Sequence, residues 1–321
     1  MNSAGPRFPP RLPTGDAICY SGYREGQSPA TKTYPSVDQI REDLRILEKN
    51  WRLIRLYDCS VHAERVLEVI RADGLDISVM LGAYLGAEVN NFGCPWGGVY
   101  SEQELEASIA ENEAEIRRLV ALARRYEDIV FSVAVGNEAT VDWTDHCVPV
   151  PRMIELGRRV RSAVRQPVTF CENYVPWQQK LHELVAEVDF ISLHTYPVWE
   201  YKHIHEAIHH TKDNYASVAG RYPDKPVVIT EAGWATNSNG RGIPPEHSSQ
   251  ELQEIYYADL MAWTREAGVL TFVFEAFDEP WKGSPDPMEP EKHWGLFTVD
   301  RQPKRLMRGL YPELVTAAAR V

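Results

Sequence analysis

Eight short apolar runs, each bounded by polar or turn-forming residues, constrain the fold of this 321-residue chain more than any other feature. The runs are Ala17 to Ser21, Leu53 to Tyr57, Ile77 to Tyr84, Ile129 to Val135, Val168 to Cys171, Phe190 to Tyr196, Val227 to Thr230 and Thr271 to Phe277. Apolar residues recur at spacings of three and four between them, as in VDQIREDLRILEKN, AERVLEVIRADG, EASIAENEAEIRRLVALARRY and QELQEIYYADLMAWTREAG, which predicts amphipathic helices. Strand and helix therefore alternate along the chain.

Near-continuous apolar strands that are each followed by a helix predict a parallel sheet covered by helices. We expect an α/β fold in which this sheet closes into a single (β/α)8 TIM barrel over residues 16–321. An open, doubly wound sheet is the competing architecture, but its first turn is usually rich in glycine, and YSGYREGQSP lacks G-x-G-x-x-G. Residues 1–15, rich in Pro and Gly, predict a poorly ordered N-terminal arm.

The formal net charge is -12, and an acidic chain repels phosphate backbones and anionic lipid head groups. We therefore expect neither nucleic acid nor a membrane surface to bind. The sequence has no apolar run of the length that spans a bilayer, and MNSAGPRFPPRLPTG lacks the apolar core of a secretory leader. The five cysteines are scattered without CxxC spacing, which favours a reducing compartment. A cytoplasmic location is expected; a removed leader and a periplasmic or extracellular location stay open, and oligomeric state is not indicated.

Carboxylates end two of the predicted strands. FSVAV leads into Gly-Asn137-Glu138, and PVVIT leads into Glu231-Ala-Gly-Trp234. A charge at the buried end of a strand is costly unless it is paired, hydrogen-bonded or facing a polar cavity. Retaining glycoside cleavage needs two such groups, one acid and one nucleophile, and long Glu side chains could converge across a barrel mouth. Asn137 could bind a sugar 2-hydroxyl, and Trp234 could offer an aromatic face.

Both motifs resemble glycoside hydrolase family 17, which comprises β-1,3-glucanases and related β-1,3-glucanosyltransferases. They are Val135-Gly-Asn-Glu138 and Ile229-Thr-Glu-Ala-Gly-Trp234. Similar stretches follow the family order: Tyr20 to Arg24, Gln27 to Pro29, Ile54 to Tyr57, Tyr196-Pro197, Phe277 to Lys282 and Glu291 to Phe297. The likeness spans about residues 17 to 300 and is closer to the bacterial branch, and the eighth-strand block is its most specific part.

The resemblance implies retaining cleavage of β-1,3-glucosidic bonds in laminarin-like β-glucans through a covalent glycosyl-enzyme. It assigns Glu138 as general acid/base and Glu231 as nucleophile, and it gives Glu279, Lys282 and Glu291 supporting roles. We expect Lys282 to lie near Glu231 and to lower its pKa, because a neighbouring cation favours the carboxylate.

Further substrate-binding or supporting residues are expected at strand ends, namely Tyr20, Tyr57, Asn173, Tyr196 and Trp281. Pyranose rings pack on aromatic faces, and the polar tips can reach hydroxyl groups. Carboxyl groups supply acid, base and nucleophile, so we expect no cofactor and no metal. The expected partner is a β-glucan polysaccharide or oligosaccharide.

Three alternatives to a hydrolytic glycosidase remain open, together with the choice between endo and exo action. Transfer to a second sugar could replace hydrolysis, because Pro280 stands where plant family members usually carry Asn. Endo and exo action are equally open. His205-Glu206-x-x-His209 matches the H-E-x-x-H pattern of zinc peptidases, although no downstream third-ligand motif follows. A carbohydrate-binding barrel without turnover is the third, but such a protein would be expected to lack one carboxylate.

Overall fold

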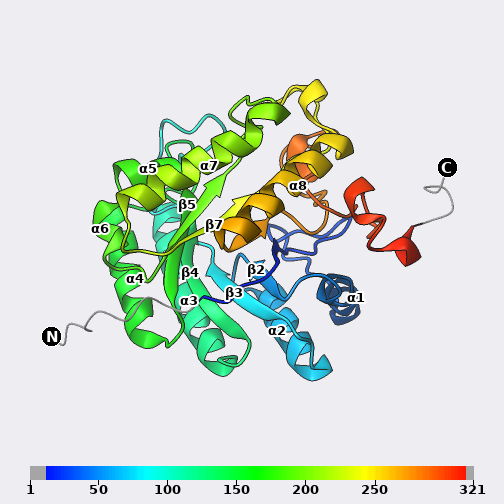
Figure 1. The fold of residues 1–321 in the computed structure, drawn as a ribbon. Coiled ribbons are helices and arrows are strands. Elements are labelled where there is room, and N and C mark those ends of the chain that lie inside the picture. Colours follow the sequence, from blue (N-terminus) through cyan, green and yellow to red (C-terminus); the bar gives the residue numbers. More distant parts are fainter. Residues whose placement is uncertain (1–11, 316–321) are drawn as a thin grey trace.

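Eight parallel strands close into a barrel in the computed structural model, which describes residues 12–315 (Figure 1). Neighbours in the chain are neighbours in the sheet, and the pairing of β1 with β8 completes the ring. The strands are β1 (Ala17–Cys19), β2 (Leu53–Leu56), β3 (Ser78–Ala83), β4 (Val130–Asn137), β5 (Val168–Asn173), β6 (Ile191–Thr195), β7 (Val227–Ala232) and β8 (Thr271–Val273). The predicted (β/α)8 TIM barrel is confirmed, and the open sheet is wrong.

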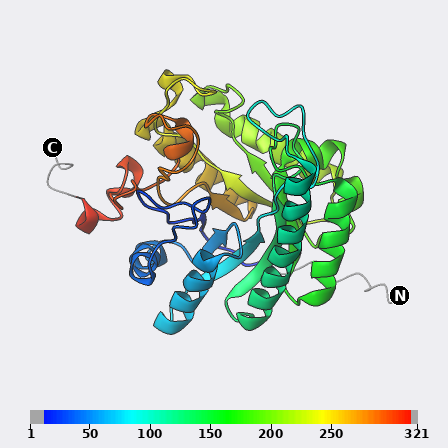
Figure 2. The ribbon, with the colours of Figure 1, turned by 180° about the vertical axis from the view of Figure 1, so that it is seen from behind.

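Helices surround the barrel, as the two opposite views show (Figure 1, Figure 2). They are α1 (Val37–Glu48), α2 (Val61–Asp73), α3 (Glu102–Arg125), α4 (Val150–Ala163), α5 (Tyr174–Gln179), α6 (His182–Val185), α7 (Ile204–Arg221) and α8 (Gln250–Ala267). Four short 3₁₀ helices are η1 (Pro245–His247), η2 (Pro290–Lys292), η3 (Arg305–Met307) and η4 (Pro312–Leu314).

Local sequence explains where several helices begin and end. Ser36 and Gln39 form a capping box at the start of α1, and Ser101 and Glu104 form another at α3. Each pair satisfies backbone N–H groups that the first helical turn leaves unpaired. Gly74 ends α2 in the left-handed conformation that glycine adopts without steric cost.

The eighth strand departs from its predicted range. A run from Thr271 to Phe277 was expected, but β8 ends at Val273. The backbone beyond it bonds elsewhere: the Ala276 amide donates to the Cys19 carbonyl at 2.9 Å, and the Leu296 amide donates to the Glu275 carbonyl at 2.9 Å. The apolar run is therefore continuous in sequence while its later half pairs with β1 and a C-terminal segment.

Part of the predicted arm over residues 1–15 lies outside the described residues, which begin at residue 12. Residues 12–15 contain no helix or strand. The domain boundary at residue 16 stays a prediction. Among residues 12–315, no helix has the length and apolar character needed to cross a membrane.

Candidate active site

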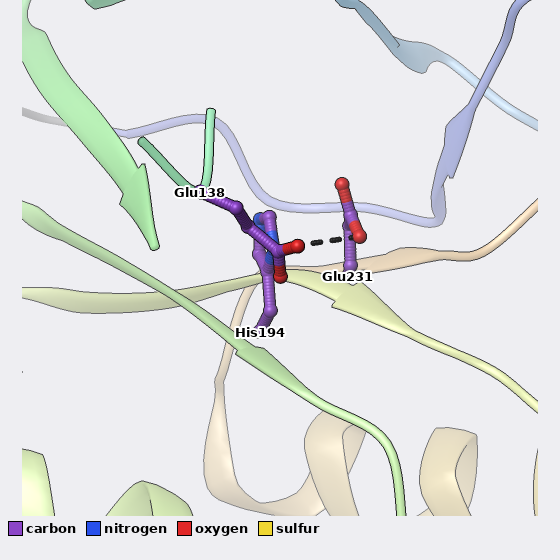
Figure 3. A group of neighbouring side chains, drawn as sticks. All are labelled: Glu138, His194 and Glu231. Atoms are coloured by element: carbon purple, nitrogen blue, oxygen red, sulfur yellow. Dashed lines mark hydrogen bonds and ion pairs between the residues drawn. The ribbon is translucent and has the colours of Figure 1, made fainter. Parts of the chain in front are cut away.

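Glu138 and Glu231 meet at the carboxyl end of the barrel strands, together with His194 (Figure 3). Glu138 directly follows β4, whereas Glu231 is the second-last residue of β7. One carboxylate oxygen from each and one ring nitrogen of His194 all lie within 4.8 Å of one another. The Glu138 side chain keeps 28% of its exposure and Glu231 only 6%. The pair is therefore asymmetric, with one reachable carboxyl group and one enclosed one.

The end of β4 has an unusual backbone that aims Glu138 into the site. Gly136 has φ +91° and Glu138 has φ +45°, both in the left-handed range that side chains other than glycine rarely adopt. The Glu138 amide donates to the Cys171 carbonyl at 2.9 Å, which ties this turn to β5. Backbone strain of this kind is retained where the surrounding structure fixes it, commonly at functional sites.

Arg55 reaches Glu231 from β2 and is itself almost fully buried. Its Nη1 donates to Glu231 Oε1 at 2.6 Å, and its Nη2 donates to Asn137 Oδ1 at 2.5 Å. The Tyr196 hydroxyl donates to Glu231 Oε2 at 2.5 Å. Burial raises the pKa of Glu231, but the charges of His194 and Arg55, with the bond from Tyr196, outweigh it and lower the pKa below its usual range. Glu231 is therefore held as a carboxylate.

His194, from β6, links the two carboxylates. Its Nδ1 lies 2.8 Å from Glu138 Oε1 and 3.4 Å from Glu231 Oε2. Burial lowers the pKa of His194, but the neighbouring negative charge of Glu231 and the contacts with Glu138 raise it to about 10. An imidazolium at neutral pH places a positive charge between the acid and the nucleophile.

Lys282, expected near Glu231, makes its ion pairs with two other carboxyl groups, whereas the cations that lower the pKa of Glu231 are His194 and Arg55. Its Nζ lies 3.0 and 2.9 Å from the two Glu275 carboxylate oxygens and 2.6 Å from Glu279 Oε2. Trp281 Nε1 donates to Glu279 Oε1 at 3.0 Å. Burial raises the pKa of both carboxyl groups, but Lys282 outweighs burial at Glu279, so that pKa is lowered while the pKa of Glu275 stays raised. The Lys282 ammonium group is thus paired with two buried carboxyl groups.

The charges of Glu138, Glu231 and Lys282 act on the pKa of Glu291. Burial raises its pKa to about 7; Lys282 opposes the shift, and Glu138 and Glu231 add to it. Glu291 therefore titrates near neutrality, within the electrostatic field of both carboxylates.

Tyr57 and Asn173 occupy supporting positions. The Tyr57 ring lies 4.4 Å from the Arg55 guanidinium carbon, a cation–π contact that fixes Arg55. Asn173 Oδ1 accepts from the Val175 amide at 2.9 Å and so begins α5. Asn137, whose oxygen is taken by Arg55, keeps its amide nitrogen as the end that can donate to a sugar hydroxyl.

Two of the residues predicted to bind substrate or to support the site are too buried to contact a sugar. Tyr20 is 1% exposed, and its hydroxyl donates to Asp43 Oδ2 at 3.0 Å. Trp234 is 1% exposed, its Nε1 donates to the His247 carbonyl at 2.8 Å, and its ring packs against Tyr256 of α8. Trp234 follows β7 and packs between barrel and helix, so it shows no face to a ligand.

The H-E-x-x-H segment does not assemble a metal site. His205, Glu206 and His209 lie exposed on α7 in the outer ring of helices. Within residues 12–315, the group whose ligand atoms converge is instead Glu138, His194 and Glu231. A protonated imidazole has no lone pair to offer, and Arg55 already occupies one oxygen of Glu231, so these residues suit an ion-pair network better than a metal ion.

Sequence reasoning missed three buried polar residues of the site: Arg55, His194 and Glu275. Arg55 stands alone in the apolar strand LIRL, and His194 stands in ISLHT. An isolated charged or titratable residue in a buried strand is costly without a partner. That cost could have identified both of them from the sequence.

A family model described as the BtgE/BtgC glycoside hydrolase domain matches residues 17–295. A protein of Arthroderma benhamiae named glucan 1,3-beta-glucosidase is 33% identical over 212 residues, covering 60% of this chain and 66% of that protein. A probable glucan endo-1,3-beta-glucosidase of Aspergillus flavus is 25% identical over 296 residues, covering 84% of this chain and 40% of that protein. The match thus spans less than two thirds of these relatives.

Solved structures share the fold. An endo-laminarinase from Formosa Hel1_33_131 superposes with a TM-score of 0.81 at 28% identity, covering 93% of this chain and 87% of that one. A glycoside hydrolase family 17 β-1,3-glucanosyltransferase from Rhizomucor miehei superposes with a TM-score of 0.70 at 22% identity, covering 90% and 95%. The latter likeness concerns the barrel fold alone.

Proposed function

We propose that this chain, which belongs to the family of BtgE/BtgC glycoside hydrolase domains, cleaves β-1,3-glucosidic bonds in β-glucans with retention of configuration. Family membership supplies the reaction class. The observation that carries the retaining mechanism is the approach of Glu138 and Glu231 oxygens within 4.8 Å. Carboxyl groups lie roughly 5 to 5.5 Å apart in retaining enzymes and roughly 6.5 to 9.5 Å apart in inverting ones.

The asymmetry of the two carboxyl groups assigns their roles. Glu231 is enclosed and held ionised, so it attacks the anomeric carbon, while Glu138 gives its proton to the glycosidic oxygen as the carbon–oxygen bond breaks. The leaving chain departs as an alcohol and a glycosyl ester forms on Glu231. Water then attacks the same carbon, Glu138 takes its proton, and the Glu231 carboxylate is released.

The frame around Glu231 prepares it for attack. Arg55 and Tyr196 each occupy one of its oxygens, which orients the carboxylate before substrate arrives. Preorganised donors of this kind stabilise charge in a transition state without reorganisation. Asn137, fixed by the other arm of Arg55, is available for a hydroxyl group of the sugar.

The substrate class is supported by the relatives. Proteins named for glucan 1,3-beta-glucosidase activity match most of this chain, and the endo-laminarinase superposes on 93% of it at 28% identity. Laminarin, a β-1,3-glucan, is therefore the substrate to test first.

Product analysis on laminarin and its oligomers tests the proposal. Wild-type protein should cleave them in the presence of a chelator, and NMR should show the β-anomer first. Glu231→Ala should abolish cleavage, whereas Glu138→Ala with azide should yield a β-glycosyl azide from a donor with a good leaving group. Products longer than the starting oligomer would assign transfer to a second sugar in place of water. An α-anomer as first product, or full activity in Glu231→Ala, would contradict the mechanism.

We propose a reducing compartment for the protein. The cysteines, including the buried Cys19, Cys59 and Cys171, are all unpaired, which is typical of proteins kept reduced in the cytoplasm. Fractionation followed by thiol counting of the isolated protein checks this, and a disulfide would contradict it.

A further inference from the structure

Four large aromatic side chains are exposed on the parts of the chain that follow β3 and β4. Tyr84, Phe92, Trp96 and Trp143 are 45%, 81%, 57% and 41% exposed. They lie on the segments that follow β3 and β4, and we call them the aromatic rim. Exposed apolar side chains grouped in this way mark binding surfaces more often than chance scatter does.

Hydrogen bonds join the two segments into one surface. Asn91 Nδ2 donates to the carbonyls of Asp142 and Thr144 at 2.9 and 2.8 Å. The Tyr100 hydroxyl donates to the Asp145 carbonyl at 2.8 Å. The segment that carries Phe92 and Trp96 is therefore fixed against the one that carries Trp143.

A pocket of about 370 Å³ opens between these segments. Its walls include Tyr84, Tyr100, Glu104, Asp145 and His146. The volume falls within the range of roughly 300 to 1,000 Å³ that small-molecule sites occupy. Aromatic faces combined with carboxylate, imidazole and phenol groups suit a pyranose, which presents apolar faces and a ring of hydroxyl groups. Gly97, next to Trp96, approaches the Asp145 side chain, so the rim borders the pocket.

One residue of the pocket wall contacts the turn that carries Glu138. His146 Nε2 lies 2.9 Å from the carbonyl oxygen of Asn137, the residue before Glu138. The Tyr84 hydroxyl lies 3.1 Å from His146 Nδ1, and the two rings are 4.8 Å apart. One wall of the pocket is thus built directly on the turn that carries the acid.

We propose that the aromatic rim and this pocket bind the leaving-group portion of the glucan, the sugars on the reducing side of the cleaved bond. The assignment rests on the proposed function. Glu138 gives its proton to the glycosidic oxygen, so the departing sugars lie on its side, where the pocket opens. In a transfer reaction the acceptor sugar occupies the same surface.

Two substrates, measured with the same variant, separate sugar binding at this surface from the chemical step. Laminarihexaose places sugars on both sides of the cleaved bond, whereas laminaribiosyl fluoride has only fluoride as leaving group. The measured quantity is the ratio of kcat/KM on the hexaose to kcat/KM on the fluoride. Trp96→Ala should lower this ratio roughly tenfold, and the Trp96→Ala/Trp143→Ala double variant should lower it further.

Control variants make the test specific. Trp96→Phe should keep most of the wild-type ratio, because the aromatic face remains. Leu310→Ala, which truncates a side chain that is 48% exposed and lies outside the rim, should keep all of it. An unchanged ratio in the double variant, or a parallel loss on both substrates, would overturn the assignment. A wild-type protein that cleaves neither substrate would instead overturn the proposed function.

Discussion

At the scale of single residues, Arg55 and His194 decide the ionisation of Glu231. A carboxyl group that is 6% exposed would be neutral over much of the physiological pH range without neighbouring cations. Arg55 is permanently charged, while His194 can lose its proton. The nucleophile therefore depends on one fixed charge and one that titrates.

Replacing Arg55 by Met should shift the pH dependence of catalysis. The guanidinium lowers the pKa of Glu231, so its loss raises that pKa, and the acidic limb of kcat/KM moves to higher pH. At neutral pH kcat/KM should fall by about 100-fold, since a preorganised donor is also lost. Arg52→Met is the matched control, because Arg52 is 57% exposed and its ion pair is with the exposed Asp76. An acidic limb that stays in place would contradict the role given to Arg55.

Residue identity predicted the two carboxylates and Tyr196, which donates to Glu231, but not the cations that pair with them. Strand ends in a parallel barrel share one face, so Glu138 and Glu231 could be assigned to one site from sequence. Which cation reaches Glu231 depends on side-chain reach across the closed barrel. Lys282 is expected near Glu231, but its ion pairs are with Glu275 and Glu279, whereas Arg55 reaches Glu231 from β2. Such choices depend on three-dimensional distances that no spacing in the chain records.

At the scale of elements, the end of β4 shows how a strand positions its catalytic group. Gly136 has φ +91°, and a Cβ added there would lie 3.0 Å from Met153 Cε and 3.1 Å from Phe170 Cε2. The strand can turn here only because this position lacks a side chain. The turn then directs Glu138 toward His194.

Gly136→Ala should therefore both destabilise the protein and reduce turnover. The strained backbone and the crowded Cβ should lower the free energy of unfolding by about 2 kcal/mol, measured by urea denaturation. Turnover of laminarin should fall as well, because Glu138 moves with the turn. Gly220→Ala in α7 is the control, since an added Cβ meets nothing there and alanine favours the helix. Equal stability of the two variants would contradict the strain argument.

The boundaries of helices and strands could be predicted where the hydrophobic pattern of the sequence determines them. The helices at α1, α2, α3 and α8 and all eight strands follow from periodicity. The early end of β8 does not, because residues 274–277 stay buried and apolar apart from Glu275 while their backbone partners change to Cys19 and the 294–297 segment. The apolar character of a segment indicates that it is buried, whereas its backbone pairing depends on segments far away in the chain.

At the scale of the whole molecule, a buried ion pair ties the C-terminal part of the chain to the first helix. Arg301 Nε and Nη2 lie 2.6 Å from the two carboxylate oxygens of Asp43, and both side chains are nearly inaccessible. The Tyr20 hydroxyl donates to the same carboxylate. This contact explains why Tyr20 belongs to the framework and not to the substrate cleft.

Arg301→Met should cost about 3 kcal/mol of unfolding free energy, because the buried Asp43 carboxylate loses the partner that binds both of its oxygens, although it keeps the Tyr20 hydroxyl and the partly exposed Arg24. Asp43→Asn combined with Arg301→Met should recover part of the loss, since the poorly compensated charge is gone. Lys49→Met provides the comparison: Lys49 also pairs across the chain, with Glu313, but both side chains are about half exposed. It should cost at most about 1 kcal/mol. Similar losses for Arg301→Met and Lys49→Met would contradict the importance of burial.

The order in which the ribosome makes this chain has a consequence for when it can act. Arg55 emerges early, Glu231 is 176 positions later, and the barrel closes only when β1 meets β8. Glu231 therefore cannot pair with Arg55 in the folded arrangement until most of the chain has been synthesised. The barrel wall around the active site is also incomplete until then. Incomplete translation products should be inert toward glucan, so catalytic activity begins only once the entire barrel has been made.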